Sequence, residues 1–184
     1  MNPVENLAIL VPLKGFRVAK SRLRVAGVSG VDDVARSLAD RVLRASTPRA
    51  LFVACESPDV VVFALERGAQ VIESSSTNLN EAVTYSYRLL SDSFERIVIA
   101  HGDLRDPAGL GEFDPAPGIT VVADSHRTGT NVLALPTGLD FTFFFGTNSA
   151  LAHQREARRL GIEVHVEFNS PWRYDVDEPD DFAN

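Results

Sequence analysis

A short stretch of the chain, LKGFRVAKSRL at residues 13–23, combines two lysines, two arginines and a glycine. Lys14 and Lys20 are the only lysines among the 18 basic residues of the protein. Ammonium and guanidinium groups neutralise phosphates, and backbone N–H groups in a glycine-containing loop add further donors. The Walker A and GxGxxG patterns are both absent. The spacing therefore leaves two interpretations open, a triphosphate-binding loop and a solvated surface loop.

Three aspartates are candidates for binding a divalent cation. Asp103 follows the apolar run at residues 96–100, and Asp175 and Asp177 are two positions apart, so in an extended chain these two share one face. Carboxylates held close together repel one another unless a cation joins them, and Mg²⁺ prefers oxygen ligands. The alternatives are a turn-forming aspartate at position 103 and a helix that begins within residues 177–182. A helix that begins within residues 177–182 is also compatible with a metal site at Asp175 and Asp177.

Two further segments, DSHRTGTN at residues 124–131 and GTNS at residues 146–149, could bind a second anion. The second segment precedes an expected helix, and hydroxyl and backbone N–H groups at a helix N-terminus bind anions without additional charge. Ordinary helix capping is the simpler explanation of GTNS taken alone. His126 and Arg127 would add cationic character or lie in solvent, and the sequence assigns no role to His153.

Together these groups meet the requirements of nucleotidyl transfer: a cationic loop for a nucleoside triphosphate, carboxylates for a metal ion and a second anion site for the acceptor. A phosphate or carboxylate nucleophile is already deprotonated at neutral pH, so positioning and charge neutralisation can carry the rate. No convincing Ser/His/Asp or Cys/His pair is found, which is consistent with this chemistry.

The elements that must position these groups alternate between short apolar runs and amphipathic stretches. This alternation predicts an α/β fold with a largely parallel sheet. We expect strands at residues 7–13, 51–55, 71–72, 96–100, 119–124, 132–135 and 163–167, and helices at residues 32–45, 58–68, 79–90 and 149–160. Ligands bind at the carboxyl ends of strands in open α/β sheets, and this is where the polar groups fall.

The composition limits the number of domains and the partners. A chain of 184 residues that is 45% hydrophobic and 23% charged predicts a single domain over residues 1–184. The net charge of −7 disfavours nucleic-acid binding, and the single cysteine, Cys55, excludes an intrachain disulfide. No apolar run reaches the roughly 18–20 residues that span a bilayer, and no signal peptide is recognised. We therefore expect a cytoplasmic protein without nucleic-acid or membrane partners, and a homodimer remains open.

Six motifs are spread over nearly the whole chain: VPLK…AKSRL (11–23), NLNEA (78–82), GDL (102–104), D…RTGTNVL (124–133), FGTNSALAHQREA (145–157) and DVDEPDDF (175–182). Together they resemble the guanylyltransferases of deazaflavin coenzyme (factor 420) biosynthesis, which act on 2-phospho-L-lactate or phosphoenolpyruvate. The resemblance implies a three-layer, Rossmann-like nucleotidyltransferase fold similar to that of the molybdenum-cofactor guanylyltransferases, with a mixed, mostly parallel central sheet.

The resemblance also implies roles for individual residues. Lys14, Lys20 and Asp103 would be catalytic. GTP would be bound by Leu13, Lys14, Gly15, Lys20, Arg22 and Asn80. One or two Mg²⁺ ions would be bound by Asp103, Asp177 and Asp175. The acceptor would be bound by Thr130, Gly146 and Ser149, and its phosphate oxygen would attack the α-phosphorus of GTP and release pyrophosphate.

Three positions depart from the family pattern. Arg105 stands where the family usually has proline, Glu178 where it usually has threonine, and Asn148 where it often has glycine. Arg105 and Asn148 fall near the expected acceptor site, so they bear mostly on the identity of the acceptor. The alternatives are a related nucleotidyltransferase with another acceptor and a catalytically silent paralogue that binds a nucleoside triphosphate.

Overall fold

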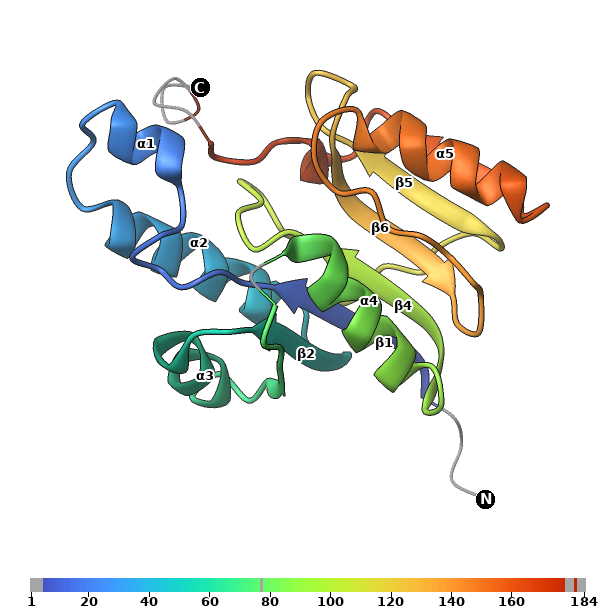
Figure 1. The fold of residues 1–184 in the computed structure, drawn as a ribbon, viewed down its shortest axis with the longest axis horizontal. Helices are drawn as coiled ribbons and strands as arrows, with labels where there is room; N and C mark the ends of the chain where they lie inside the picture. The colour runs from blue at the N-terminus through green and yellow to red at the C-terminus, as the bar shows by residue number, and fades with distance from the viewer. Residues whose placement is uncertain (1–4, 77, 178–180, 182–184) are drawn as a thin grey trace.

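The computed structural model describes residues 5–76, 78–177 and 181, and in these residues seven strands form one sheet (Figure 1). The strands are β1 (Glu5–Pro12), β2 (Ala50–Cys55), β3 (Gln70–Glu73), β4 (Phe94–Ala100), β5 (Ile119–Ala123), β6 (Thr130–Pro136) and β7 (Val164–Glu167). Their order is β3-β2-β1-β4-β6-β5-β7. Strand β6 runs antiparallel to β4 and β5, and the other pairs are parallel. The expected mixed, mostly parallel sheet is confirmed.

Helices cover both faces of this sheet and complete three layers. The helices are α1 (Ser21–Val25), α2 (Val31–Ala45), α3 (Pro58–Leu65), α4 (Leu79–Leu90), α5 (Ser149–Arg159) and the 3₁₀ helix η1 (Pro171–Arg173). Buried side chains of α2 and α3 pack on one face, and those of α4 and α5 pack on the other. No helix in the described residues is both long enough and apolar enough to cross a membrane.

Strand β1 lies near the middle of the sheet and shows how the sequence produces these layers. Leu7, Ile9 and Val11 belong to the core beneath α2 and α3, whereas Ala8 and Leu10 belong to the core beneath α4 and α5. Successive side chains of a strand point to opposite faces. A strand covered on both faces therefore reads as a continuous apolar run rather than as an alternation.

One segment differs from the sequence-based expectation, while the expected strands and helices are found within a few residues of their predicted bounds. Residues 21–25 form α1 within the expected loop, and Arg24 ties this helix back through a hydrogen bond from its guanidinium to the Phe16 carbonyl oxygen, 2.6 Å long. The apolar run at residues 141–145 packs in the core without joining the sheet. The helix start expected within residues 177–182 lies outside the described residues except for Asp177 and Asp181.

Shortening a side chain in the central strands should destabilise the protein strongly. Ile99 on β4 is fully buried, so Ile99→Ala should lower the free energy of unfolding by roughly 2–5 kcal/mol in urea denaturation. Val62→Ala on the outer surface of α3, where the side chain is 57% exposed, is the matched control and should change stability little. Equal effects of the two substitutions would contradict the assigned core.

Candidate active site

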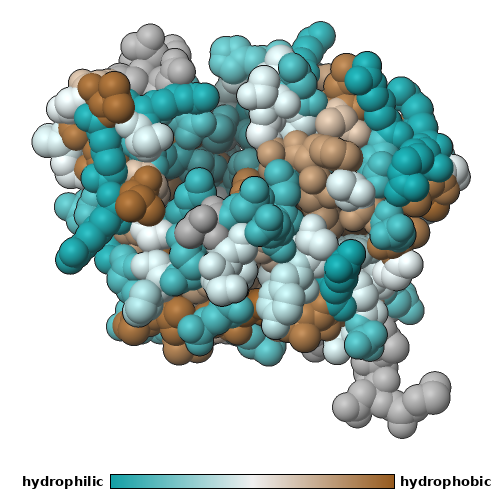
Figure 2. Space-filling view, viewed as in Figure 1, coloured by the Kyte–Doolittle hydropathy of each residue, from teal (hydrophilic) through white to brown (hydrophobic). Residues whose placement is uncertain are grey.

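The carboxyl ends of β1, β2 and β4 border a cavity of about 400 Å³. Its lining comes from the loop after β1, the end of β2, the start of α4, the turn after β4 and Asp177. The space-filling view shows a hollow on this face with hydrophilic residues around it (Figure 2). Four of the six expected nucleotide-binding residues line the cavity: Leu13, Lys14, Lys20 and Arg22.

The loop after β1 is fixed against β2 and the turn that follows β2. The backbone N–H of Leu13 donates to the carbonyl oxygen of Ala54 over 2.9 Å. A Cβ added at Gly15 would lie 3.0 Å from Ser57 Oγ, so a larger residue would force the loop and this turn apart. Gly15 thus allows the close approach of the two segments, while neighbouring side chains of the loop line the cavity.

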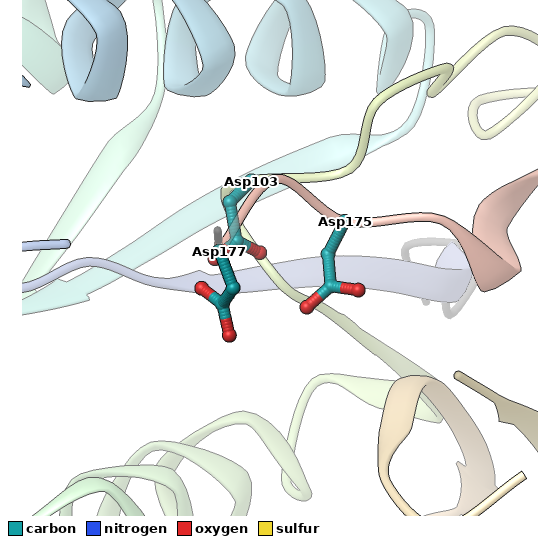
Figure 3. A group of neighbouring side chains, drawn as sticks. All are labelled: Asp103, Asp175 and Asp177. Atoms are coloured by element: carbon teal, nitrogen blue, oxygen red, sulfur yellow. The ribbon is translucent and has the colours of Figure 1, made fainter. Parts of the chain in front are cut away.

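The chain after η1 brings two aspartates to Asp103. Leu104 and Asp175 form an antiparallel bridge, and the backbone N–H of Val176 donates to the carbonyl oxygen of Asp103 over 3.1 Å. As a result, one carboxylate oxygen from each of Asp103, Asp175 and Asp177 lies within 4.8 Å of the other two (Figure 3). The structure therefore brings together the three aspartates that the sequence offered as metal ligands.

Lys20 supplies positive charge among these carboxylates. Its Nζ donates to Asp103 Oδ2 and, over 2.9 Å, to Asp177 Oδ1. Burial lowers the pKa of Lys20, but the charges of Asp103 and Asp177 outweigh burial and raise it above its ordinary value. Burial, helped by the charges of Asp103 and Asp177, raises the pKa of Asp175 to about 6. Arg22 adds a second positive charge, because its Nη1 donates to Asp177 Oδ2 over 3.4 Å. Two cations do not balance three carboxylates, so the cluster still attracts positive charge.

The three aspartates fit a divalent cation. Asp103 Oδ1 is buried and has no hydrogen-bond partner in the described part of the chain. Such an oxygen is unfavourable unless a cation or donor meets it. Three carboxylates also form the all-oxygen donor set that Mg²⁺ prefers. The amide of Asn131 helps to hold this set, because its Nδ2 donates to Asp175 Oδ1 over 3.4 Å.

Residues 141–145 follow an extended path that side chains, rather than a neighbouring strand, hold in place. Three side chains accept hydrogen bonds from its backbone: Glu156 from Thr142 (2.9 Å), His153 from Phe144 (3.0 Å) and Asn80 from Phe145 (2.7 Å). Phenylalanine rings of the same segment pack into the core beneath α4 and α5. The position of the following loop, residues 146–149, is therefore set by buried polar groups as well as by packing.

Asn80 occupies a different place from the one expected for a nucleoside contact. Its Oδ1 accepts from the Phe145 N–H, and its Nδ2 donates to the Phe145 carbonyl oxygen over 3.0 Å. Asn80 is also not among the residues that line the cavity. In this structure its side chain joins α4 to the segment that leads into the expected acceptor loop.

The three expected acceptor residues lie at the start of α5 and β6. Gly146 and Asn148 both have positive φ angles, 130° and 59°, and the backbone N–H of Ser149 donates to the Gly146 carbonyl oxygen over 3.2 Å. Asparagine tolerates the left-handed conformation better than most residues, which explains how Asn148 replaces a glycine. Gly146 is exposed, whereas Thr130 and Ser149 are each about 1% exposed. The exposed part of the loop is therefore residues 146–148, while the Thr130 and Ser149 side chains lie beneath it.

His153, to which the sequence assigned no role, connects the segment at residues 141–145 to Thr130. Because its Nε2 accepts the Phe144 N–H, the ring proton lies on Nδ1, and Nδ1 donates to Thr130 Oγ1 over 3.0 Å. Burial, with a smaller contribution from His101, lowers the pKa of His153 to about 4. His153 is thus a neutral imidazole that fixes both the backbone of Phe144 and one lone pair of the Thr130 hydroxyl.

Two other residues of the cavity were missed by the sequence reasoning. His101 and Glu56 directly follow β4 and β2 and line the cavity. Their positions after two predicted strands were a signal that could have singled them out, since ligands bind at this edge of the sheet. His101 Nε2 is buried without a hydrogen-bond partner among the described residues, and burial lowers the pKa of this histidine.

Comparison with known proteins places this chain in a family. A family model described as "Guanylyl transferase CofC like" matches residues 7–184. The chain belongs to that family. Among curated relatives, the phosphoenolpyruvate guanylyltransferase of Chloroflexus aggregans is 24% identical, with 94% of this chain and 93% of that protein covered. The protein of the same name from Roseiflexus castenholzii is 29% identical, with 97% and 87% covered.

Solved structures of other proteins confirm the fold of this chain. A nucleotidyl transferase from Methanothermobacter thermautotroptrophicus matches with a TM-score of 0.69 at 14% identity, covering 97% of this chain and 94% of that one. The 4-diphosphocytidyl-2C-methyl-D-erythritol synthase of Anaerococcus prevotii matches with a TM-score of 0.62 at 10% identity, covering 98% and 96%. The expected nucleotidyltransferase fold is thereby confirmed.

The buried state of His153 gives a pH-dependent prediction. The pKa of His153 is lower in the folded chain than the ordinary value of 6.5, so the folded state binds fewer protons between pH 6.5 and about 4, and stability falls as the pH falls through this range. His153→Asn should therefore destabilise the protein more at pH 7 than at pH 5 in denaturant titrations. His126→Asn, at an exposed loop position, should show the same stability difference from wild type at both pH values. A stability deficit of His153→Asn that does not change with pH would contradict a neutral, buried His153.

Proposed function

We propose that the protein is a Mg²⁺-dependent guanylyltransferase that transfers GMP from GTP to phosphoenolpyruvate and releases pyrophosphate. The observation that carries the proposal is the cluster of Asp103, Asp175, Asp177 and Lys20 at the cavity of a chain that belongs to the guanylyl transferase family. The relatives that bear the name phosphoenolpyruvate guanylyltransferase support the choice of acceptor. We extend the proposal to 2-phospho-L-lactate as a second acceptor and to a role in deazaflavin coenzyme biosynthesis.

The loop after β1 neutralises the triphosphate. Lys14, Lys20 and Arg22 all line the cavity, and together they supply three positive charges on its wall. Lysine and arginine bind phosphate oxygens through charge-assisted hydrogen bonds. Asp103, Asp175 and Asp177 would hold Mg²⁺, whose charge stabilises the phosphate oxygens during transfer.

The acceptor requires positioning rather than a general base. A phosphate oxygen of phosphoenolpyruvate attacks the α-phosphorus of GTP, the bond from that phosphorus to the bridging α–β oxygen breaks, and pyrophosphate leaves with the bonding electron pair. Because the attacking oxygen is already an anion, no proton has to be removed first. Burial lowers the pKa of His101 and of His153, which favours the neutral form of both imidazoles. The loop at residues 146–149 and the Thr130 hydroxyl would bind the acceptor at the start of α5.

Pyrophosphate release measures the proposed reaction directly. With GTP and Mg²⁺ we expect release with phosphoenolpyruvate, more slowly with 2-phospho-L-lactate, and none without an acceptor. Asp103→Asn should lower kcat by at least about 100-fold, because the substitution removes a metal-binding charge. Asp106→Asn is the matched control, since Asp106 is exposed on the same loop and does not line the cavity. Folded wild-type protein that releases no pyrophosphate with either acid would refute the proposal.

Metal binding can be measured without turnover. In calorimetric titrations with Mg²⁺, Asp175→Asn should weaken the affinity by roughly 10-fold or more, because each carboxylate contributes to the charge of the site. Asp106→Asn should leave the affinity at the wild-type value. Equal Mg²⁺ affinity of wild type and Asp175→Asn would exclude Asp175 from the metal site. The proposed reaction is tested separately, by the pyrophosphate assay.

A further inference from the structure

The cavity has a third acidic residue, Glu56, on the side opposite to the metal-binding aspartates. Glu56 follows β2 and Asp103 lies in the turn after β4, and both line the cavity. Because β1 lies between β2 and β4 in the sheet, the two residues are about two strand spacings apart, roughly 10 Å. The sugar and base of a nucleotide can span this separation when the phosphates lie near Lys20 and Asp103.

Glu56 differs from the other acidic residues of the cavity, Asp103 and Asp177, because no ion pair engages its carboxylate in the described part of the chain. The side chain is exposed and has no hydrogen bond or ion pair within the described residues. By contrast, Asp103 and Asp177 both accept from Lys20. On the wall formed by the start of α4, Ser76 Oγ donates to Glu81 Oε2, and Asn78 Oδ1 accepts two backbone N–H groups as the helix cap.

The surroundings of Glu56 are suited to the faces and edge of a purine. Apolar side chains of Leu13, Leu79 and Ala82 line the same cavity and can contact the flat faces of a base. The hydrogen bond from Leu13 N–H to Ala54 and the close approach of Gly15 to Ser57 hold the loop after β1 beside the turn that carries Glu56. The backbone that carries Glu56 is therefore held in place at the border of the cavity.

Guanine is the base whose edge a carboxylate matches. Its N1–H and 2-amino group both donate, so one carboxylate can accept two parallel hydrogen bonds. Adenine presents the lone pair of N1 at the same place, and the carboxylate would repel it. A site built around a specific hydrogen bond rejects an analogue that cannot make it far more strongly than an apolar pocket does.

We propose that Glu56 is the residue that selects guanine, by accepting hydrogen bonds from N1–H and the 2-amino group of GTP. This inference rests on the proposed guanylyl transfer. It names the group that selects GTP rather than ATP as the nucleotide substrate. In this arrangement the residue after β2 recognises the base, and the loop after β1 binds the triphosphate. The turn after β4 and residues 175–177 bind the metal.

Nucleotide binding without an acceptor tests the role of Glu56 separately from turnover. Calorimetric affinities for GTP, ITP and ATP are measured with Mg²⁺ for wild type, Glu56→Gln and the matched control Glu73→Gln. Glu73 is an exposed glutamate at the end of the neighbouring strand β3 and does not line the cavity. ITP lacks only the 2-amino group, so it reports on one of the two hydrogen bonds, and thermal melting confirms that each variant is folded.

Wild type and Glu73→Gln should bind GTP about 10-fold or more tightly than ITP, and ATP more weakly still. Glu56→Gln should lose at least roughly 10-fold in GTP affinity and bind GTP and ITP nearly equally. Its affinity for ATP should rise relative to GTP, because a glutamine amide can pair with adenine. If Glu56→Gln keeps the wild-type ranking, the inference fails while guanylyl transfer stands. If folded wild type binds none of the three nucleotides, both the inference and the proposed function fail.

Discussion

The close grouping of three carboxylates is the constraint on which the rest of the site depends. Asp103, Asp175 and Asp177 would repel one another if nothing positive lay among them, yet the bridge between Leu104 and Asp175 fixes them together. Lys20 supplies part of the positive charge that these carboxylates need, through hydrogen bonds to Asp103 and Asp177. Its left-handed backbone, with φ of 57°, is an uncommon conformation for a residue with a side chain, and the ion pairs help to hold it. The same excess of negative charge makes the site suited to a divalent cation.

The antiparallel strand β6 brings the acceptor side to the same edge of the sheet. In a purely parallel sheet, the beginning of β6 would lie at the opposite edge from the end of β4. Because β6 is reversed, its first residues lie beside the end of β4, and the backbone N–H of His101 donates to the Asn131 carbonyl oxygen over 3.0 Å. Thr130 and Asn131 thereby reach the region of Asp103. One reversed strand thus joins the nucleotide and acceptor halves of the proposed site.

The sequence predicted the layers and most of the strands because both depend on local patterns. Apolar runs, helix caps and turn glycines act over a few residues, so β1, β4 and α5 were found close to their predicted bounds. Asn80 and His153 were harder to interpret, because their partners Phe145 and Thr130 are distant in sequence. The path of residues 141–145 likewise depends on groups elsewhere in the chain, since its backbone bonds to side chains of two helices rather than to a strand.

The sequence by itself determined that this is an α/β chain with a cationic loop, scattered carboxylates and a second polar loop near strand ends, for which anion binding stays a prediction. These properties follow from residue types and from the periods of strands and helices, which are local. Only the tertiary structure decided which charges meet, as in the pairing of Lys20 with Asp177 across 157 positions. It also decided that Asn80 bonds to Phe145 and that Glu56 borders the cavity. The physical reason is that such contacts depend on strand order and on the packing of residues 175–177 beside Asp103. The spacing of residues along the chain specifies neither of them.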